Sequence, residues 1–267
     1  MRKEGANGFH TLTSLAEHFH MDSRHRIAIM QPYFLPYLGY FQLMSKVDAF
    51  VIHDAVDFTK KSWITRNRWV RQKEIIWMNL PVERPPLGTP IREVQLREMR
   101  SWSKQWLMQC QHQYGKAPFY KETKPLIEEI AGLSASSLSN WLVDSLILVA
   151  NHLHLDTEIV RTDATMLAIE QQVRLHPQDV VRRHERVFEI TRHFGASSYI
   201  NPPGGRGLYD QERFTGRGLE LQFLQPNLGG RLHELPENER SASILHLLMH
   251  LGQRTVIASL NSPEPSV

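Results

Sequence analysis

The length, composition and charge of the chain indicate a folded globular protein. Its 267 residues, 41% hydrophobic and 22% charged, can form a sizeable core and exclude a disordered chain. The 31 Lys and Arg residues only slightly outnumber the 28 Asp and Glu residues, giving a net charge of +3, so charge alone does not indicate nucleic-acid binding.

The single cysteine and the lack of a long apolar run bear on location. Cys110 cannot form an internal disulfide, which fits a reducing compartment. No apolar stretch reaches the roughly 18 residues that a membrane span needs, and residues 1–25 carry histidines where a signal peptide would be apolar. We therefore expect a cytoplasmic protein with a flexible N-terminal extension over residues 1–25.

The predicted elements begin with an apolar strand over residues 27–30, a pattern typical of strands buried on both faces of a parallel sheet. A helical pattern starts at Tyr37, and a second apolar strand follows over residues 49–52. This order predicts a βαβ unit. Two further strands are predicted over residues 74–82 and 91–96.

A helical block follows, with helical periodicity from residue 101 to about residue 154 and breaks at residues 115–118 and 134–139. Beyond it the predicted elements are a strand at 157–161, a helix at 178–194, strands at 198–201 and 219–224, and a helix at 244–251. This alternation predicts an α/β fold with a Rossmann-like, mostly parallel sheet flanked by helices and carrying a helical insertion.

The predicted domain organisation places the α/β domain after the N-terminal extension. It covers residues 26–230 and includes the helical insertion at about residues 101–155. Residues 231–267 follow as a C-terminal helix and tail. The sequence does not indicate an oligomeric state.

An unusual run, QPYFLPYLGY at residues 31–40, separates the first strand from the first helix. In an open parallel sheet, ligands lie beyond the carboxyl ends of the strands, where the next helix points its N-terminus at them. Pro36 suits a first helical turn, and Gly39 leaves room for a ligand near the backbone. Helix N-termini favour anions such as phosphate, and tyrosine hydroxyls add donors. The alternative is that prolines shape a loop and tyrosines fill a core edge.

The same segment resembles a motif of the nucleotidylyltransferase superfamily at a distance. That superfamily has a strand, a loop and His-x-Gly-His, and here Tyr37 and Tyr40 stand where the two histidines would be. Tyrosine cannot supply the cationic imidazolium that stabilises a nucleotide phosphate during transfer. The resemblance therefore supports the fold more than it supports nucleotidyl transfer.

A closer resemblance is to the WbqC-like protein family. It is carried by IAIMQPYFLPYLGYFQL and VDAFVIHDAVDFTKKSWITRNRW, then by RVFEITRHFGASSYINPPGGRGLYDQERF and LELQFLQP, which together span about residues 27–226. The resemblance implies a transferase acting on a nucleotide-activated sugar or an acyl or aminoacyl donor, in bacterial surface polysaccharide (O-antigen, lipopolysaccharide) or related small-molecule biosynthesis. The alternative is a non-catalytic protein of such a cluster that binds a nucleotide or sugar phosphate. The cofactor, if the reaction uses one, is unknown.

The resemblance extends to individual residues. The matching positions are Gln31, Pro32, Pro36, Gly39 and Tyr40 in the opening motif, and Asp54, Trp63, Arg66, Asn67 and Arg68 after the second strand. Where the family often has a Tyr-Asp-Asp-like trio, this chain has His53-Asp54-Ala55, so a metal held by paired acids is not expected. No HExxH or GxSxG motif occurs either, and we predict no metal site.

Asp54 and His53 are the candidate catalytic residues. Asp54 follows the second strand, where a carboxylate can orient a substrate hydroxyl or amine or take its proton, and His53 can share that role. The alternatives are that Asp54 caps a turn and that His53 is structural.

A basic and aromatic segment supplies the candidate ligand-binding residues of the second wall, among them Lys61, Trp63, Arg66, Asn67 and Arg68. Arginine binds phosphate or carboxylate with two parallel hydrogen bonds, so these side chains favour an acidic small molecule. The lysines can equally form a solvated loop face. Stacking on single-stranded nucleic acid is a weaker alternative in a nearly neutral chain.

A glycine-rich loop after the strand at 198–201 is a candidate third wall. Gly204 and Gly205 let the backbone approach a ligand, and Tyr209 follows them. The loop matches neither a Walker motif nor GxGxxG, and a simple tight turn is the alternative. The predicted partner is a phosphorylated or nucleotide-activated small molecule.

Overall fold

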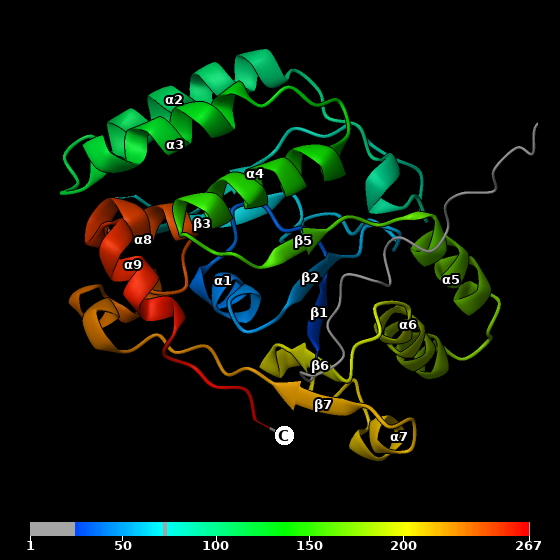
Figure 1. The fold of residues 1–267 in the computed structure, drawn as a ribbon. Coiled ribbons are helices and arrows are strands. Elements are labelled where there is room, and N and C mark those ends of the chain that lie inside the picture. The colour runs from blue at the N-terminus through cyan, green and yellow to red at the C-terminus, as the bar shows by residue number, and fades with distance from the viewer. Residues whose placement is uncertain (1–24, 72–73, 267) are drawn as a thin grey trace, which may run out of the picture.

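The computed structural model describes residues 25–71 and 74–266, so nearly all of the predicted N-terminal extension lies outside the described residues (Figure 1). Within this range lies a five-stranded sheet in which neighbouring strands are parallel. From edge to edge its strands are β5 (Glu158–Val160), β2 (Ala49–Ile52), β1 (Arg26–Met30), β6 (Ser198–Asn201) and β7 (Glu220–Phe223). The predicted α/β fold with a Rossmann-like parallel sheet is confirmed.

Along the chain, strands are added to this sheet from its centre toward its two edges. The chain starts with β1, continues through β2 to β5 at one edge, then returns to β6 beside β1 and ends with β7 at the other edge. The direction of winding therefore reverses between β1 and β6. In open parallel sheets such a reversal leaves a crevice at the carboxyl ends of the two strands, because the two connections depart to opposite sides.

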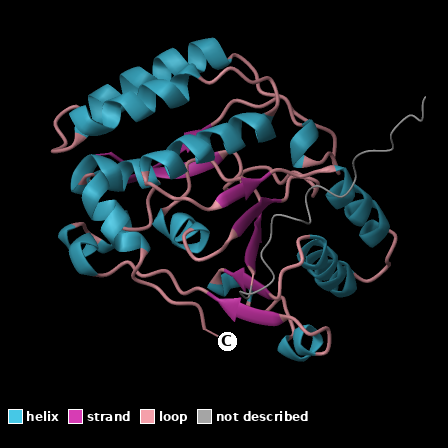
Figure 2. Ribbon diagram, in the orientation of Figure 1, coloured by secondary structure: helices cyan, strands magenta, loops and turns pink. Residues whose placement is uncertain are grey.

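Helices cover both faces of the sheet (Figures 1 and 2). One face packs against α1 (Leu38–Met44), α4 (Leu138–His152), α8 (Ile244–Leu251) and α9 (Gln253–Leu260), with α2 (Met99–Tyr114) and α3 (Tyr120–Gly132) outside α4. The other face packs against α5 (Ala164–Arg174), α6 (Asp179–His193) and α7 (Gln211–Thr215). No helix among the described residues is long and apolar enough to cross a membrane.

Alternation along the central strands produces two separate apolar cores. In β1, Ala28 faces the α1 side, whereas Ile27 and Ile29 face the α5 and α6 side. In β2, Phe50 and Ile52 face the α1 side. All five side chains are buried, which explains why these strands read as continuous apolar runs.

The predicted helical block is confirmed as α2, α3 and α4, separated at the predicted breaks. α4 leads directly into β5, a parallel neighbour of β2, so it is the last part of the crossover between these strands. Its apolar residues Trp141, Leu142 and Leu146 are buried in the core that covers this face of the sheet. Only α2 and α3 therefore form an outer layer.

Two predicted strands differ in the structure. β4 (Glu74–Asn79) pairs antiparallel with β3 (Arg66–Arg71) in a hairpin apart from the main sheet, and no strand was predicted at the position of β3. The predicted strand at 91–96 is wrong, because a 3-10 turn, η2 (Ile91–Glu93), stands there. Ile91 and Val94 are both buried, and a spacing of three residues places them on one side of such a turn.

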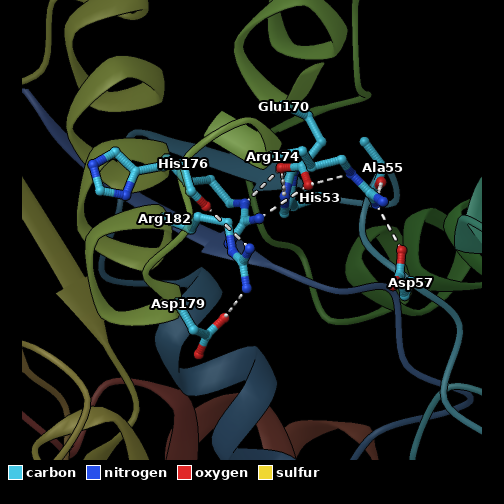
Figure 3. A network of polar contacts seen from close by, with 9 residues as sticks. His53, Ala55, Asp57, Glu170, Arg174, His176, Asp179 and Arg182 are labelled. Atoms are coloured by element: carbon cyan, nitrogen blue, oxygen red, sulfur yellow. Dashed lines mark hydrogen bonds and ion pairs between the residues drawn. The ribbon is translucent and has the colours of Figure 1, made fainter. Parts of the chain in front are cut away.

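A buried ion-pair network ties α5 and α6 to the end of β2 (Figure 3). The Glu170 carboxylate, with 5% of its side chain exposed, accepts from Arg174 Nε at 2.9 Å and Arg186 Nε at 2.6 Å. His53 Nε2 lies 3.5 Å from the same carboxylate, and Arg174 also reaches Asp57 at 2.7 Å. Burial raises the pKa of Glu170, but the contacts with His53 and Arg186 outweigh it and lower the pKa to about 2.

We predict that Glu170→Gln lowers the free energy of unfolding at pH 7 by about 3 kcal/mol, because it breaks the ion pairs that a buried carboxylate makes with Arg174 and Arg186. The pKa of Glu170 falls from an ordinary 4.5 to about 2 on folding, so its stabilisation is present above pH 4.5 and is lost as pH falls toward 2. Urea denaturation at a series of pH values should show the wild-type and variant curves converging below pH 4.5. A constant difference at all pH values would contradict this account.

The control is Glu128→Gln, which removes an exposed ion pair with Lys124 in α3. Such pairs contribute at most about 1 kcal/mol, so this variant should differ little from wild type at pH 7.

Candidate functional site

A pocket of about 380 Å³ opens at the carboxyl ends of β1 and β6, where the winding of the sheet reverses. Segments distant in the sequence converge on it. This switch-point pocket is lined by Met30, Tyr33, Pro36, Tyr37, Gly39, Tyr40, Trp63, Asn67, Arg68, Pro202, Pro203, Gly204 and Ser241. The three predicted walls therefore each contribute residues to one cavity.

Asn67 holds the loop between β1 and α1 in shape. Its side-chain Nδ2 donates to the carbonyl oxygens of Phe34, at 2.9 Å, and Leu35. Leu35 has a φ of +43°, a left-handed conformation that is unfavourable for a leucine. Ser243 Oγ donates to the same Leu35 carbonyl at 2.8 Å. Buried donors from two distant segments thus stabilise a strained loop that forms one side of the pocket.

Tyrosines supply most of the aromatic surface. Tyr40 is 2% exposed and donates its hydroxyl to the Gln31 carbonyl at 2.9 Å. Its ring lies 5.6 Å from that of Tyr33, between centroids. Burial raises the pKa of Tyr33, Tyr37 and Tyr40, so these phenols stay protonated and act as hydrogen-bond donors.

The ring of Tyr37 lies directly on Gly39. A Cβ added at Gly39 would stand 2.5 Å from Tyr37 Cε2, a distance that real side chains do not allow. The space that Gly39 leaves open is therefore filled by Tyr37 and is not an approach for a ligand to the backbone. α1 is also short, with seven residues, and Tyr37 precedes it without a capping hydrogen bond from its side chain. An aromatic ring therefore lies at the helix start, where the sequence predicted room for an anion.

Arg68 is the one charged side chain among the described residues that line the pocket. Its Nη2 donates to the Ser241 carbonyl at 3.0 Å, and its guanidinium carbon lies 5.2 Å from the centre of the Trp63 ring. Its Nε is buried without a hydrogen-bond partner. The pocket thus combines apolar aromatic walls with a single, incompletely satisfied positive charge.

Seven of the predicted binding residues come together in the pocket, namely Tyr37, Gly39, Tyr40, Trp63, Asn67, Arg68 and Gly204. Six others do not line it. Gln31 contributes its carbonyl to Tyr40, Pro32 is buried, and Lys61 is exposed with a φ of +55°.

The remaining three predicted residues lie around the pocket or on the other side of the sheet. Arg66 stacks on Trp77. Gly205 lies so close to the Asn201 side chain that no Cβ would fit there. Tyr209 packs against the second core, beside Tyr199.

The predicted catalytic residues do not reach the pocket. Alternation along β2 turns Ile52 toward α1, and therefore turns His53 to the opposite face, where it contacts Glu170. Asp54 is buried and accepts a hydrogen bond from Ser139 of α4. Their predicted role as an acid and base in this cavity has no geometric support. In residues 25–71 and 74–266, no three His, Cys, Asp or Glu side chains are grouped so as to hold a metal ion.

Six lining residues were not among the predicted binding residues: Met30, Tyr33, Pro36, Pro202, Pro203 and Ser241. Most of them flank predicted ones, so their proximity in sequence was a usable signal. Ser241 has no such signal, because it enters from the C-terminal part of the chain. It does not cap α8, whose preceding residue is Ser243.

We predict that Gly39→Ala destabilises the protein by about 1 to 2 kcal/mol, because the new methyl group displaces the Tyr37 ring. In a Tyr37→Ala background the same change should be neutral or slightly stabilising, since alanine favours helix more than glycine does. Chemical denaturation of the four proteins gives the coupling energy directly.

Gly132→Ala is the matched control, since Gly132 ends α3 and a Cβ there would meet nothing within 4 Å. If Gly39→Ala lowers the free energy of unfolding by the same amount with and without the Tyr37 ring, the ring contact is unimportant.

The sequence matches known proteins along most of its length. It is 24% identical over 233 residues to "Uncharacterized protein Rv1507c" of Mycobacterium tuberculosis (strain ATCC 25618 / H37Rv), a match that covers 85% of this chain and 94% of the relative. No solved structure matches significantly. A family model described as WbqC-like protein family matches residues 31–258, which include every pocket-lining residue except Met30. The chain therefore belongs to the WbqC-like protein family.

Proposed function

We propose that the switch-point pocket binds an acidic small molecule, with its anionic group at Arg68 and its less polar part against the tyrosines and Trp63. The observation that carries this proposal is the single guanidinium in an otherwise uncharged, aromatic lining. Open parallel sheets bind ligands at such reversals, and ligand pockets typically combine apolar walls with a few polar groups. A nucleotide-activated sugar or an acyl or aminoacyl donor has the required combination of an anion and a bulky organic group.

The lining favours binding over acid–base catalysis. Among the described lining residues there is no carboxylate and no imidazole, and the tyrosines are held in their neutral form. We therefore propose a non-catalytic binding protein for an activated donor. A transferase is the second candidate, since a guanidinium such as that of Arg68 can stabilise the negative charge that develops on a leaving group. A cytoplasmic role in surface-polysaccharide or related biosynthesis stays a prediction from the sequence.

We predict that Arg68→Gln weakens binding of the acidic ligand at least about tenfold, equivalent to about 1.4 kcal/mol. Arg68→Lys should recover only part of the affinity, because an ammonium group cannot reproduce the planar guanidinium fork. Isothermal titration with nucleotides, nucleotide sugars and acyl or aminoacyl donors measures the effect, after a thermal-shift screen selects the ligand.

Arg192→Gln is the control for general charge, since Arg192 lies in α6 with 78% of its side chain exposed. Equal affinity of wild type and Arg68→Gln for every bound ligand would refute the proposed site.

The two roles differ in turnover. Mass spectrometry of the bound donor, incubated with candidate acceptors, should detect it unchanged if the protein only binds it. Product formed by the wild type and lost in Arg68→Gln would establish the transferase instead.

A further inference from the structure

Two tryptophan–arginine pairs extend outward from the switch-point pocket. The Arg68 guanidinium stacks on the ring of Trp63. The Arg66 guanidinium stacks on the ring of Trp77 in β4, with its carbon 4.0 Å from the centre of the ring. The two indole centroids are 5.6 Å apart. Both indoles face solvent, with 41% of Trp63 and 44% of Trp77 exposed. Large aromatic side chains are rarely left this exposed, so the arrangement calls for a reason beyond packing.

The β3–β4 hairpin fixes this geometry. Arg66 and Arg68 are two residues apart in β3, so their side chains leave the same face about 7 Å apart. Trp77 is the cross-strand partner of Arg68, and Arg66 reaches it along the diagonal. The two guanidinium groups therefore stand in a row that begins inside the pocket and ends outside it.

Neither guanidinium has an acidic partner among the described residues. Within these residues the Arg66 side chain makes no hydrogen bond or ion pair, and the Arg68 side chain makes one hydrogen bond, to a carbonyl. The Nε of each is buried and unpartnered. Arg174 and Arg186, by contrast, are both paired with Glu170. Stacking on an indole uses only the face of a guanidinium, so its in-plane N–H groups remain free for an anion.

We infer that Arg66 and Arg68 together bind a diphosphate. This inference rests on the proposed function and narrows its ligand to small molecules that carry a diphosphate group. A monophosphate or a carboxylate occupies Arg68 alone. A diphosphate spans the row and gains a second charge-assisted contact at Arg66.

The test compares binding affinities by isothermal titration at fixed ionic strength. The pairs of ligands are a nucleoside monophosphate with the nucleoside diphosphate, and inorganic phosphate with inorganic diphosphate. Wild type should bind the diphosphate member of each pair at least tenfold more tightly. Arg66→Gln should remove this preference and leave monophosphate affinity unchanged, whereas Arg68→Gln should weaken both. A preference that persists in Arg66→Gln would overturn the inference and leave the pocket intact. If Arg68→Gln binds both the monophosphate and the diphosphate as tightly as wild type does, the proposed function itself is wrong.

Discussion

The site depends on one topological constraint, the reversal of winding between β1 and β6. Parallel neighbours need long crossovers, and the crossovers from these two strands leave toward opposite edges of the sheet. The gap between them is covered by the loop before α1, the first turn of α1, the strand β3 and the loop after β6. The residues of those loops were then free to be aromatic, strained or charged, because the sheet beneath them is held by two separate apolar cores.

Hydrogen bonds from distant segments give these loops a defined shape. Asn67 and Ser243 both donate to the carbonyl of Leu35, whose left-handed backbone would otherwise be costly. A loop held in this way does not have to be ordered by its ligand, so less binding energy is lost on association. The same logic applies at the opposite face, where Glu170 gathers cations from α5 and α6, but there the charges satisfy one another.

The central strands and the helical block were predictable from the sequence, because continuous apolar runs and helical periodicity can be recognised without knowing what the elements pack against. It did not reveal β3, whose alternating Arg, Asn and Trp residues read as a basic loop until the partner strand β4 is seen. Within the site, residues of unusual type near one another in the chain were identifiable, as with Tyr37, Tyr40 and Arg68. His53 was assigned to the wrong side of the sheet, although counting alternation from Phe50 would have placed it correctly. Ser241 could not be found, because its contact with Arg68 spans 173 positions.

That long-range contact also sets when the pocket becomes complete during synthesis. The aromatic wall leaves the ribosome among the first elements, whereas the carbonyl that holds Arg68 belongs to a segment made near the end. Chains fold largely from the N-terminus as they emerge, so β1, β2 and β5 are available well before the cavity is complete. The complete pocket requires β6, β7 and Ser241, and therefore most of the chain.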